Sequence, residues 1–392
     1  LRGVADFWEK DLVCRDGVYH VVGDGMHERT DGNIRDNGVP EDPVNTLGYL
    51  KTFFTWMPRI SEALDLDEKK REKWLEIAEN LAPYPKGTIR EIQENPTLWK
   101  EVDVKLEDLL PEEMLDKEIY YDEGIGGKWS FHFPGNVMQI YPGNAIGLGS
   151  APEELEVARN TVQIHALVEN ALGELEYRKA LEEAEFADKD NANNLLFNSN
   201  GELENGEAYR NGMESGGVKN PHFYKAGAFN ASNLSCLFFT AAVRVGYAPE
   251  IIWKEMRDMI LNRGIPNGFL KENPHGIEQL NTIPDAIQEM MLQSCEGMIR
   301  IFPVWPRAEH PNASFRNFRA WGGLEVSAAL KDGEVERVSI LSHKGHPCRV
   351  ENPWPGKSVK VSYEYGRPDE VHFGEYLNIE LYKEEHAELF RI

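Results

Sequence analysis

The spacing of apolar residues changes near residue 306, and this change constrains the fold more than any other feature of the chain. Up to about residue 305, apolar residues recur every three or four positions, which is the period of an amphipathic helix. From Arg307 onward they alternate with polar residues, which is typical of half-buried strands. We therefore expect a helical domain over residues 1–306 and a small antiparallel, β-sandwich-like domain over residues 307–392.

The first part contains several continuous apolar stripes. They predict helices over residues 1–14, 46–64, 67–82, 152–182, 232–245, 249–261 and 283–294. Long polar segments at 24–41, 121–150, 188–225 and 262–282 separate these helices. Loops of more than about 15 residues are uncommon unless they build a site. Helical hairpins joined by such loops, with a β domain after them, favour an (α/α) toroid.

Strand-like alternation in the second part covers residues 321–330, 336–342, 357–364 and 376–382. The first two of these segments are joined by Lys331-Asp332-Gly333, which is typical of a tight turn. The charged turns of this part carry no cluster of site-type residues. We expect the β domain to pack against the helical domain and to lie away from any functional site.

The charge balance argues against several classes of partner. The chain has 42 Lys and Arg residues but 66 Asp and Glu residues, so its net charge is −24. A surface of this charge repels phosphate backbones and anionic lipid, which disfavours nucleic-acid binding. The apolar runs are short, and none is long enough to be inserted in a membrane.

Common sequence motifs of other enzyme classes are not found. The chain has no GxGxxG, Walker, HExxH or GxSxG sequence, and its histidines and cysteines do not pair at metal-ligand spacing. We therefore predict no bound metal and no cofactor.

Three polar loops, at 23–31, 128–136 and 273–281, combine carboxylate, amide, His and Trp side chains. A carboxylate accepts hydrogen bonds from sugar hydroxyls, and an amide both donates to them and accepts from them. Aromatic rings stack on sugar C–H faces. These loops predict a carbohydrate substrate, with Trp129, His132, Asn136 and Asn273 as candidate contacts. A purely structural role is the alternative for each of these four residues.

Several stretches of the chain also resemble one enzyme family. Residues 141–146 read YPGNAI, 158–162 read ARNTV, 288–294 read QEMMLQS and 318–326 read FRAWGGLEV. These are similar to the YPGNQI, AARKTL, EMLLQS and LRARGGFEV stretches of glycoside hydrolase family 95, the α-L-fucosidases and α-L-galactosidases. Residues 242–246 and the 331–333 turn agree too, and the order and approximate spacing match across nearly the whole chain.

The resemblance implies two site carboxylates. By position, the family's general acid corresponds to Glu28, although the letters around it differ. The second essential carboxylate precedes the EMLLQS helix, and counting back from Ser294 places Glu278 there. The family has Asp followed by an Asn/Gly-rich stretch at this point, so the substitution puts the sugar specificity in question. A solvated loop carboxylate for Glu28 and a helix-cap region for Glu278 are the structural alternatives.

The family's activity implies an inverting exo-glycoside hydrolase that acts outside the cytoplasm on a terminal α-L-fucoside or α-L-galactoside of an oligo- or polysaccharide. Glu28 would protonate the leaving oxygen, and Glu278 would activate a water on the opposite face of the sugar. The family's water-positioning Asn belongs to a motif that would precede Leu1. The resemblance therefore implies an (α/α)6 toroid that here lacks its first helices, and we expect the chain to be the C-terminal part of a longer polypeptide.

Two other functions stay open on the sequence alone. A different carbohydrate-active toroid, such as a polysaccharide lyase or epimerase, would use a Tyr, His or Lys as its base, and Tyr19, Tyr121 and Tyr224 are available. A non-catalytic sugar-binding or scaffold protein would keep its sugar affinity after loss of both carboxylates.

Overall fold

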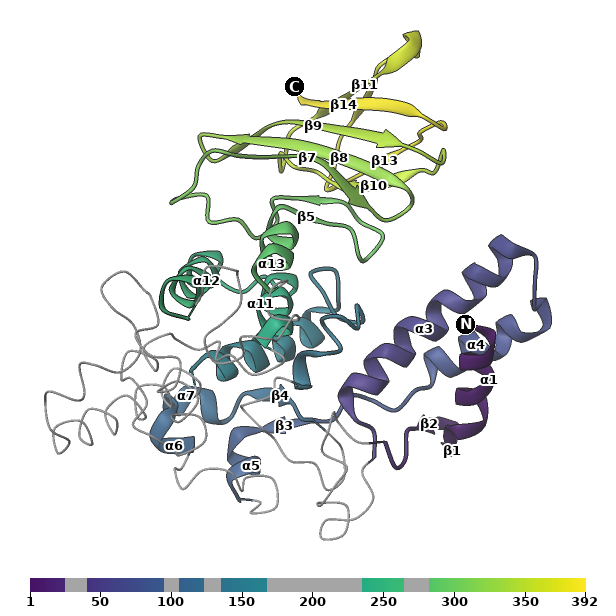
Figure 1. Cartoon of the computed structure of the whole chain (residues 1–392), viewed down its shortest axis with the longest axis vertical. Helices are drawn as coiled ribbons and strands as arrows, with labels where there is room; N and C mark the ends of the chain where they lie inside the picture. The colour runs from purple at the N-terminus through teal and green to yellow at the C-terminus, as the bar shows by residue number, and fades with distance from the viewer. Residues whose placement is uncertain (25–40, 95–105, 123–134, 168–234, 264–281) are drawn as a thin grey trace, which may run out of the picture.

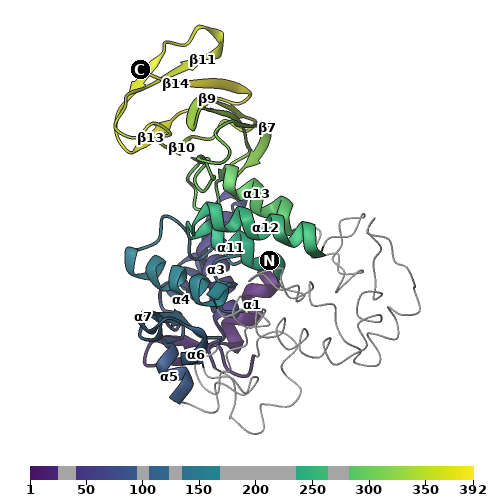
Figure 2. The same cartoon turned by 90° about the vertical axis from the view of Figure 1, so that its left-hand side faces the viewer.

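The computed structural model describes residues 1–24, 41–94, 106–122, 135–167, 235–263 and 282–392. The helices lie in the lower part of Figure 1 and the β domain lies above them. In the perpendicular view of Figure 2, the β domain again lies beyond one end of α13, so the described molecule is elongated. Among the described residues, no helix has both the length and the apolarity needed to cross a membrane.

The N-terminal helices enclose a small core of their own. Its elements are α1 (Arg2–Asp11), β1 (Val13–Arg15), β2 (Val18–His20), α3 (Val44–Leu64), the short 3-10 helix η2 (Glu68–Lys70) and α4 (Arg71–Glu79). Phe54 of α3 and Trp74 and Ile77 of α4 are fully buried in this core. The Trp74 indole nitrogen donates to Glu9 Oε1 at 2.7 Å, which attaches α4 to α1.

The middle of the chain starts with the short elements β3 (Lys86–Thr88), α5 (Ile89–Glu94), α6 (Leu106–Leu109), α7 (Glu112–Leu115), β4 (Glu118–Tyr120) and η3 (Gly135–Val137). β3 and β4 form an antiparallel pair. Residues 152–167 are helical. The helices α11 (Ser235–Arg244), α12 (Pro249–Arg263) and α13 (Thr282–Met291) follow, and α13 points toward the β domain (Figure 1).

The C-terminal part is a six-stranded antiparallel sheet with the order β12-β11-β14-β9-β8-β7. A second pair, β10–β13, shares its core. The strands of this part are β5 (Leu292–Gln293), β6 (Arg300–Ile301), β7 (Ala313–Ala320), β8 (Leu324–Lys331), β9 (Glu334–Ser342), β10 (Cys348–Glu351), β11 (Val359–Tyr363), β12 (Glu370–His372), β13 (Tyr376–Ile379) and β14 (Glu385–Arg391), with the 3-10 helix η6 (Glu364–Gly366) after β11. In β8 every second side chain is buried, as its alternating sequence predicts.

The expected antiparallel β domain after a helical part is therefore confirmed. Three antiparallel strand pairs, β1–β2, β3–β4 and β5–β6, lie within the part expected to be helical, and the described chain is a mixture of helix and strand. The described helices do not establish the (α/α)6 toroid, which stays a prediction.

Candidate functional site

Five of the six predicted site residues lie outside the described part of the chain. These are Glu28, Trp129, His132, Asn273 and Glu278, which fall in the segments 25–40, 123–134 and 264–281. The sixth, Asn136, lies in η3 and is described. The site is therefore built here from the residues that border these segments.

Asn136 is completely buried, and both ends of its amide are used inside the protein. Its Nδ2 donates to the backbone oxygen of Tyr120 at 2.9 Å, and its Oδ1 faces Nε2 of His165 at hydrogen-bond distance. Burial lowers the pKa of His165 to about 3, so the ring is neutral and its Nε2 carries the proton that it donates to Asn136. The structure gives Asn136 a structural role, and its contact with a sugar stays a prediction.

The start of α3 lies beside the borders of two of the three segments. Thr46 Oγ1 donates to Asp24 Oδ2 at 2.6 Å, and Asp24 directly precedes segment 25–40. The backbone N–H of Val44 donates to the oxygen of Asp122 at 2.9 Å, and Asp122 directly precedes segment 123–134. The first turn of α3 thus contacts the described end of two segments. One of them carries Glu28, and the other carries Trp129 and His132.

The third segment, 264–281, ends at the first turn of α13, and this turn is hydrogen-bonded to the residues that follow η3. Tyr141 follows η3 along the chain, and its hydroxyl donates to Oδ2 of Asp285 in α13 at 2.7 Å. Asn136, on η3 itself, is attached to Tyr120 at the end of β4. The described borders of the segments holding Glu28 and Glu278 are therefore linked through α3, β4 and residues 135–141.

A buried polar network holds this arrangement together. Arg244, at the end of α11, donates through Nη2 to Oε1 of Glu289 at 2.8 Å, through Nη1 to Oδ1 of Asn144, and lies over the ring of Tyr141 at 4.7 Å. Only 7% of the Arg244 side chain and 18% of the Glu289 side chain are exposed. We call Tyr141, Asn144, Arg244, Asp285 and Glu289 the Arg244 network.

The Arg244 network consists of residues from the stretches that resemble the glycosidase family, apart from Asp285, which lies just before one of them. Residues 141–146, 242–246 and 288–294 are far apart in sequence and meet here. A fourth stretch, 318–326, joins them because the backbone N–H of Trp321 donates to Oγ of Ser294 at 3.1 Å. These residues contact one another, so they fix the start of α13 relative to residues 140–144.

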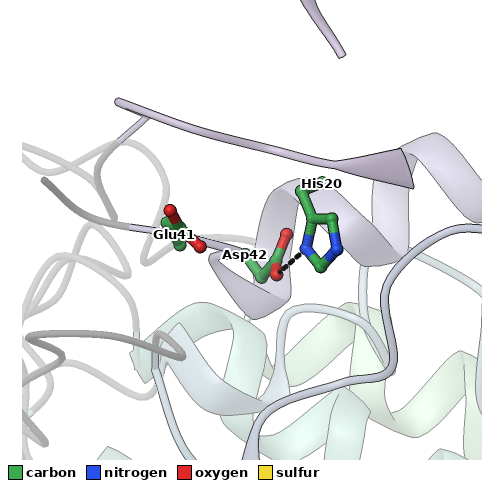
Figure 3. A group of neighbouring side chains, drawn as sticks. All are labelled: His20, Glu41 and Asp42. Atoms are coloured by element: carbon green, nitrogen blue, oxygen red, sulfur yellow. Dashed lines mark hydrogen bonds and ion pairs between the residues drawn. The ribbon is translucent and has the colours of Figure 1, made fainter. Parts of the chain in front are cut away.

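One group among the described residues has the spacing of a metal site. His20, Glu41 and Asp42 can each offer a ligand atom within 4.8 Å of the others. Figure 3 shows Asp42 pointing at His20, whose Nδ1 lies 2.8 Å from Asp42 Oδ2. Both oxygens of Glu41 accept from Arg15 at 3.0 Å, and this ion pair holds the pKa of Glu41 below its usual range. Glu41 and Asp42 already have hydrogen-bond partners within the protein, in Arg15 and His20, so no ion is needed to hold the three side chains together.

Three tyrosines are candidates for the base of a lyase. The two that the structure describes are poorly suited to that role. The Tyr19 hydroxyl donates to Oε1 of Glu76 at 2.6 Å, and this hydrogen bond raises the pKa of Tyr19. The Tyr121 hydroxyl donates to the oxygen of Thr88 at 3.0 Å, and burial raises the pKa of Tyr121 as well. A base must be deprotonated to act, so neither phenol is poised for it. Tyr224 lies outside the described residues.

The Arg244 network could not have been located from the sequence, because its members are separated by up to 148 positions, from Tyr141 to Glu289. The resemblance of the stretches was the one signal that pointed to them. Comparison with known proteins adds no further assignment: no protein-family model matches this chain, and no curated protein sequence matches it.

Proposed function

We propose that this chain is an inverting exo-glycoside hydrolase that removes a terminal α-L-fucoside or α-L-galactoside from an oligo- or polysaccharide, outside the cytoplasm. One observation carries the proposal. The described borders of the segments that hold Glu28 and Glu278 are linked by short hydrogen bonds through α3, β4 and α13. This arrangement supports a shared site for two carboxylates that are 250 positions apart in the sequence.

In the proposed reaction, Glu28 is the general acid and Glu278 is the general base. Glu28 gives its proton to the glycosidic oxygen as the bond to the anomeric carbon breaks. Glu278 takes a proton from the water that attacks the opposite face of the same carbon, which inverts the configuration. The proposal requires a separation of about 6.5–9.5 Å between the two carboxyl groups, because a water must fit between Glu278 and the sugar.

The Arg244 network supports this proposal by fixing the chain next to the proposed base. Glu278 is four positions before Thr282, the first residue of α13. The bond from Tyr141 to Asp285 and the ion pair from Arg244 to Glu289 hold the first two turns of that helix. A base has to be held within a fraction of an ångström to act on a water, so a rigid helix start is a suitable support.

The test of the two roles compares aryl glycosides, whose leaving group is a phenolate, with an oligosaccharide, whose leaving group is a sugar hydroxyl. With an aryl α-L-fucoside and an aryl α-L-galactoside, Glu278→Gln should lower kcat by at least about 10²-fold, since an amide cannot accept the proton. Glu28→Gln should reduce the rate much more for an oligosaccharide than for the aryl glycoside, because a phenolate leaves without a proton. The exposed Glu79 of α4 provides the matched control, and Glu79→Gln should keep both rates.

The product distinguishes this function from the alternatives. Inversion predicts that the free sugar is released first as the β anomer, which proton NMR detects before mutarotation. An unsaturated product from a uronate polymer would indicate a lyase instead. Sugar binding without turnover, unchanged in Glu28→Gln and Glu278→Gln, would indicate a non-catalytic sugar-binding protein. Equal rates for these two variants and Glu79→Gln would contradict the assignment of both carboxylates.

A further inference from the structure

A cavity of about 310 Å³ lies between the start of α3, residues 81–86, the end of β4 and the helical residues 152–167. Figure 1 shows the antiparallel β3–β4 pair beside the lower end of α3. Its volume is at the lower end of the range for ligand pockets, which is about 300–1,000 Å³, so it suits a small ligand. Asn136, the one predicted site residue that the structure describes, does not line it.

The walls of the cavity combine aromatic rings with both kinds of charge. Tyr84 and Tyr120 meet edge to face, with ring centroids 5.8 Å apart, and aliphatic side chains of α3 and residues 152–167 complete the apolar wall. The polar lining consists of Lys51, Lys86, Glu153 and Glu154. Two lysines and two glutamates line the cavity and Lys86 also pairs with Glu118 at 2.9 Å, so the cavity carries little net charge and does not select a strongly charged ligand.

Several of these polar groups still have hydrogen-bonding capacity. Lys51 Nζ donates to the oxygen of Ala78 at 2.6 Å, which uses one of its three protons. The Tyr120 hydroxyl donates to the backbone oxygen of Glu154 at 3.3 Å, which leaves the carboxylate of that residue for other donors. Burial, and then the charge of Glu154, raise the pKa of Tyr84, so its hydroxyl is a protonated donor.

An apolar wall with mixed donors and acceptors around it fits a neutral ring that carries several hydroxyl groups. Each sugar hydroxyl can donate to a carboxylate and accept from an ammonium or a phenol, while its C–H face lies on an aromatic ring. We infer that this cavity is a second saccharide site that binds one sugar ring apart from the proposed carboxylate pair. The choice of a saccharide over another neutral polyol rests on the proposed function.

The test reads the occupancy of the cavity directly. The protein is labelled with fluorotyrosine, and the fluorine NMR signal that is missing in Tyr84→Phe is assigned to Tyr84. Titration with methyl α-L-fucoside or methyl α-L-galactoside at millimolar concentration should shift this signal in a saturable way. Glycine, a zwitterion, and glycerol, a polyol without a ring, serve as comparison ligands and should leave the signal in place.

A pair of variants on one helix tests the contacts. Glu153→Gln removes a charged acceptor from the cavity and should weaken saccharide binding by about tenfold or more, the usual effect of one hydrogen bond to a charged group. Glu156 is exposed on the same helix and does not line the cavity, so Glu156→Gln should bind as the unchanged protein does. Equal affinity for both variants would overturn the inference.

Binding in the cavity and hydrolysis can fail independently. In Glu278→Gln, methyl α-L-fucoside should still shift the Tyr84 signal, because the described wall of the cavity consists of other residues. A saturable shift in a protein that hydrolyses no glycoside would keep the second site and refute the proposed enzyme. Turnover without any shift of the Tyr84 signal, or a shift produced by glycine and not by the sugars, would refute the second site.

Discussion

At the scale of single residues, His165 is the clearest example of a group whose ionisation depends on folding. Its ring is buried, contacts Asn136 through Nε2 and lies edge to face with Phe238 at 5.7 Å. Burial lowers the pKa of His165 to about 3, well below the ordinary value of 6.5. The unfolded chain binds a proton at this residue below about pH 6.5, and the folded chain does so only near pH 3.

This difference predicts that His165 makes the fold sensitive to acid. Between about pH 6.5 and 3, the unfolded state holds more protons, so the free energy of unfolding should fall by about 1 kcal/mol for each pH unit as the pH decreases. His165→Gln keeps a donor and an acceptor for Asn136 but does not titrate. Urea unfolding of both proteins from pH 8 to pH 4 should show a shallower dependence for His165→Gln. If the free energies of unfolding of the two proteins depend on pH in the same way, His165 does not cause the sensitivity to acid.

The ion pair in the Arg244 network leads to a second prediction. Arg244→Met leaves the partly buried carboxylate of Glu289 without its partner, which should lower the free energy of unfolding by about 3–5 kcal/mol. The double variant Arg244→Met/Glu289→Gln should be more stable than Arg244→Met alone, since it removes the unpaired charge as well. Urea unfolding at neutral pH compares the unchanged protein, the single variants Arg244→Met and Glu289→Gln, and the double variant. A double variant that loses the sum of both single effects would contradict a direct pairing.

At the scale of elements, the turn between β8 and β9 depends on two residues with positive φ. Asp332 has φ 51° and Gly333 has φ 80°, and they are the two residues between Lys331 and Glu334. Positive φ at both positions is typical of the type I′ turn, which matches the twist of a hairpin. A Cβ on Gly333 would meet nothing within 4 Å, so only the backbone conformation opposes a larger residue there.

Replacement of this glycine should therefore cost only backbone energy. Gly333→Ala should lower the free energy of unfolding by about 1–2 kcal/mol, the cost of a left-handed conformation for a residue with a Cβ. The matched control is Gly3→Ala in α1, where no atom lies within 4 Å of the added Cβ and the helix should gain up to about 1 kcal/mol. Thermal unfolding should show a lower midpoint for Gly333→Ala and an equal or higher midpoint for Gly3→Ala. A stabilising Gly333→Ala would be incompatible with the turn described here.

At the scale of the whole molecule, one hydrophobic cluster extends from the helices into the β domain. It includes Ala286 and Met290 of α13, Phe302, and residues of β7 to β11, β13 and β14. The ring of Phe302 lies 5.4 Å from that of Phe315 in β7, and the backbone of Ile299 pairs with β10 through bonds of 2.8 and 2.9 Å. A boundary between residues 306 and 307 therefore cuts through packed side chains.

This packing predicts where the β domain can be separated. A fragment of residues 307–392 loses the covering of Phe315 by Phe302 and should unfold without a cooperative transition. A fragment of residues 292–392 keeps β5, β6 and Phe302 and should unfold cooperatively. Thermal unfolding followed by near-UV circular dichroism compares them. Cooperative unfolding of the shorter fragment at the same midpoint would place the boundary at 306/307.

Apolar periodicity by itself determined the position of most helices and of four strands. The expected helix 46–64 corresponds to α3, 249–261 to α12, and the strand 336–342 to β9. It succeeded there because an amphipathic stripe records which side of an element is buried. It missed β7 and β14, and it extended the helices 1–14 and 283–294 beyond their ends at Asp11 and Met291. The pair Asp16-Gly17 was a usable signal for the hairpin that ends α1.

Tertiary structure alone decided the features that depend on distant partners. Residues 292–293 leave the helix because they pair with residues 300–301, and periodicity holds no information about a pairing partner. In the same way, Arg244 meets Asn144 and Glu289 only after α11, α13 and residues 135–144 have packed. The sequence proposed Glu28 and Glu278 as a pair, and the fold supplied the linked borders of their segments. A local pattern specifies which face of an element is buried, but long-range packing chooses what that face meets, since its energy depends on both partners at once.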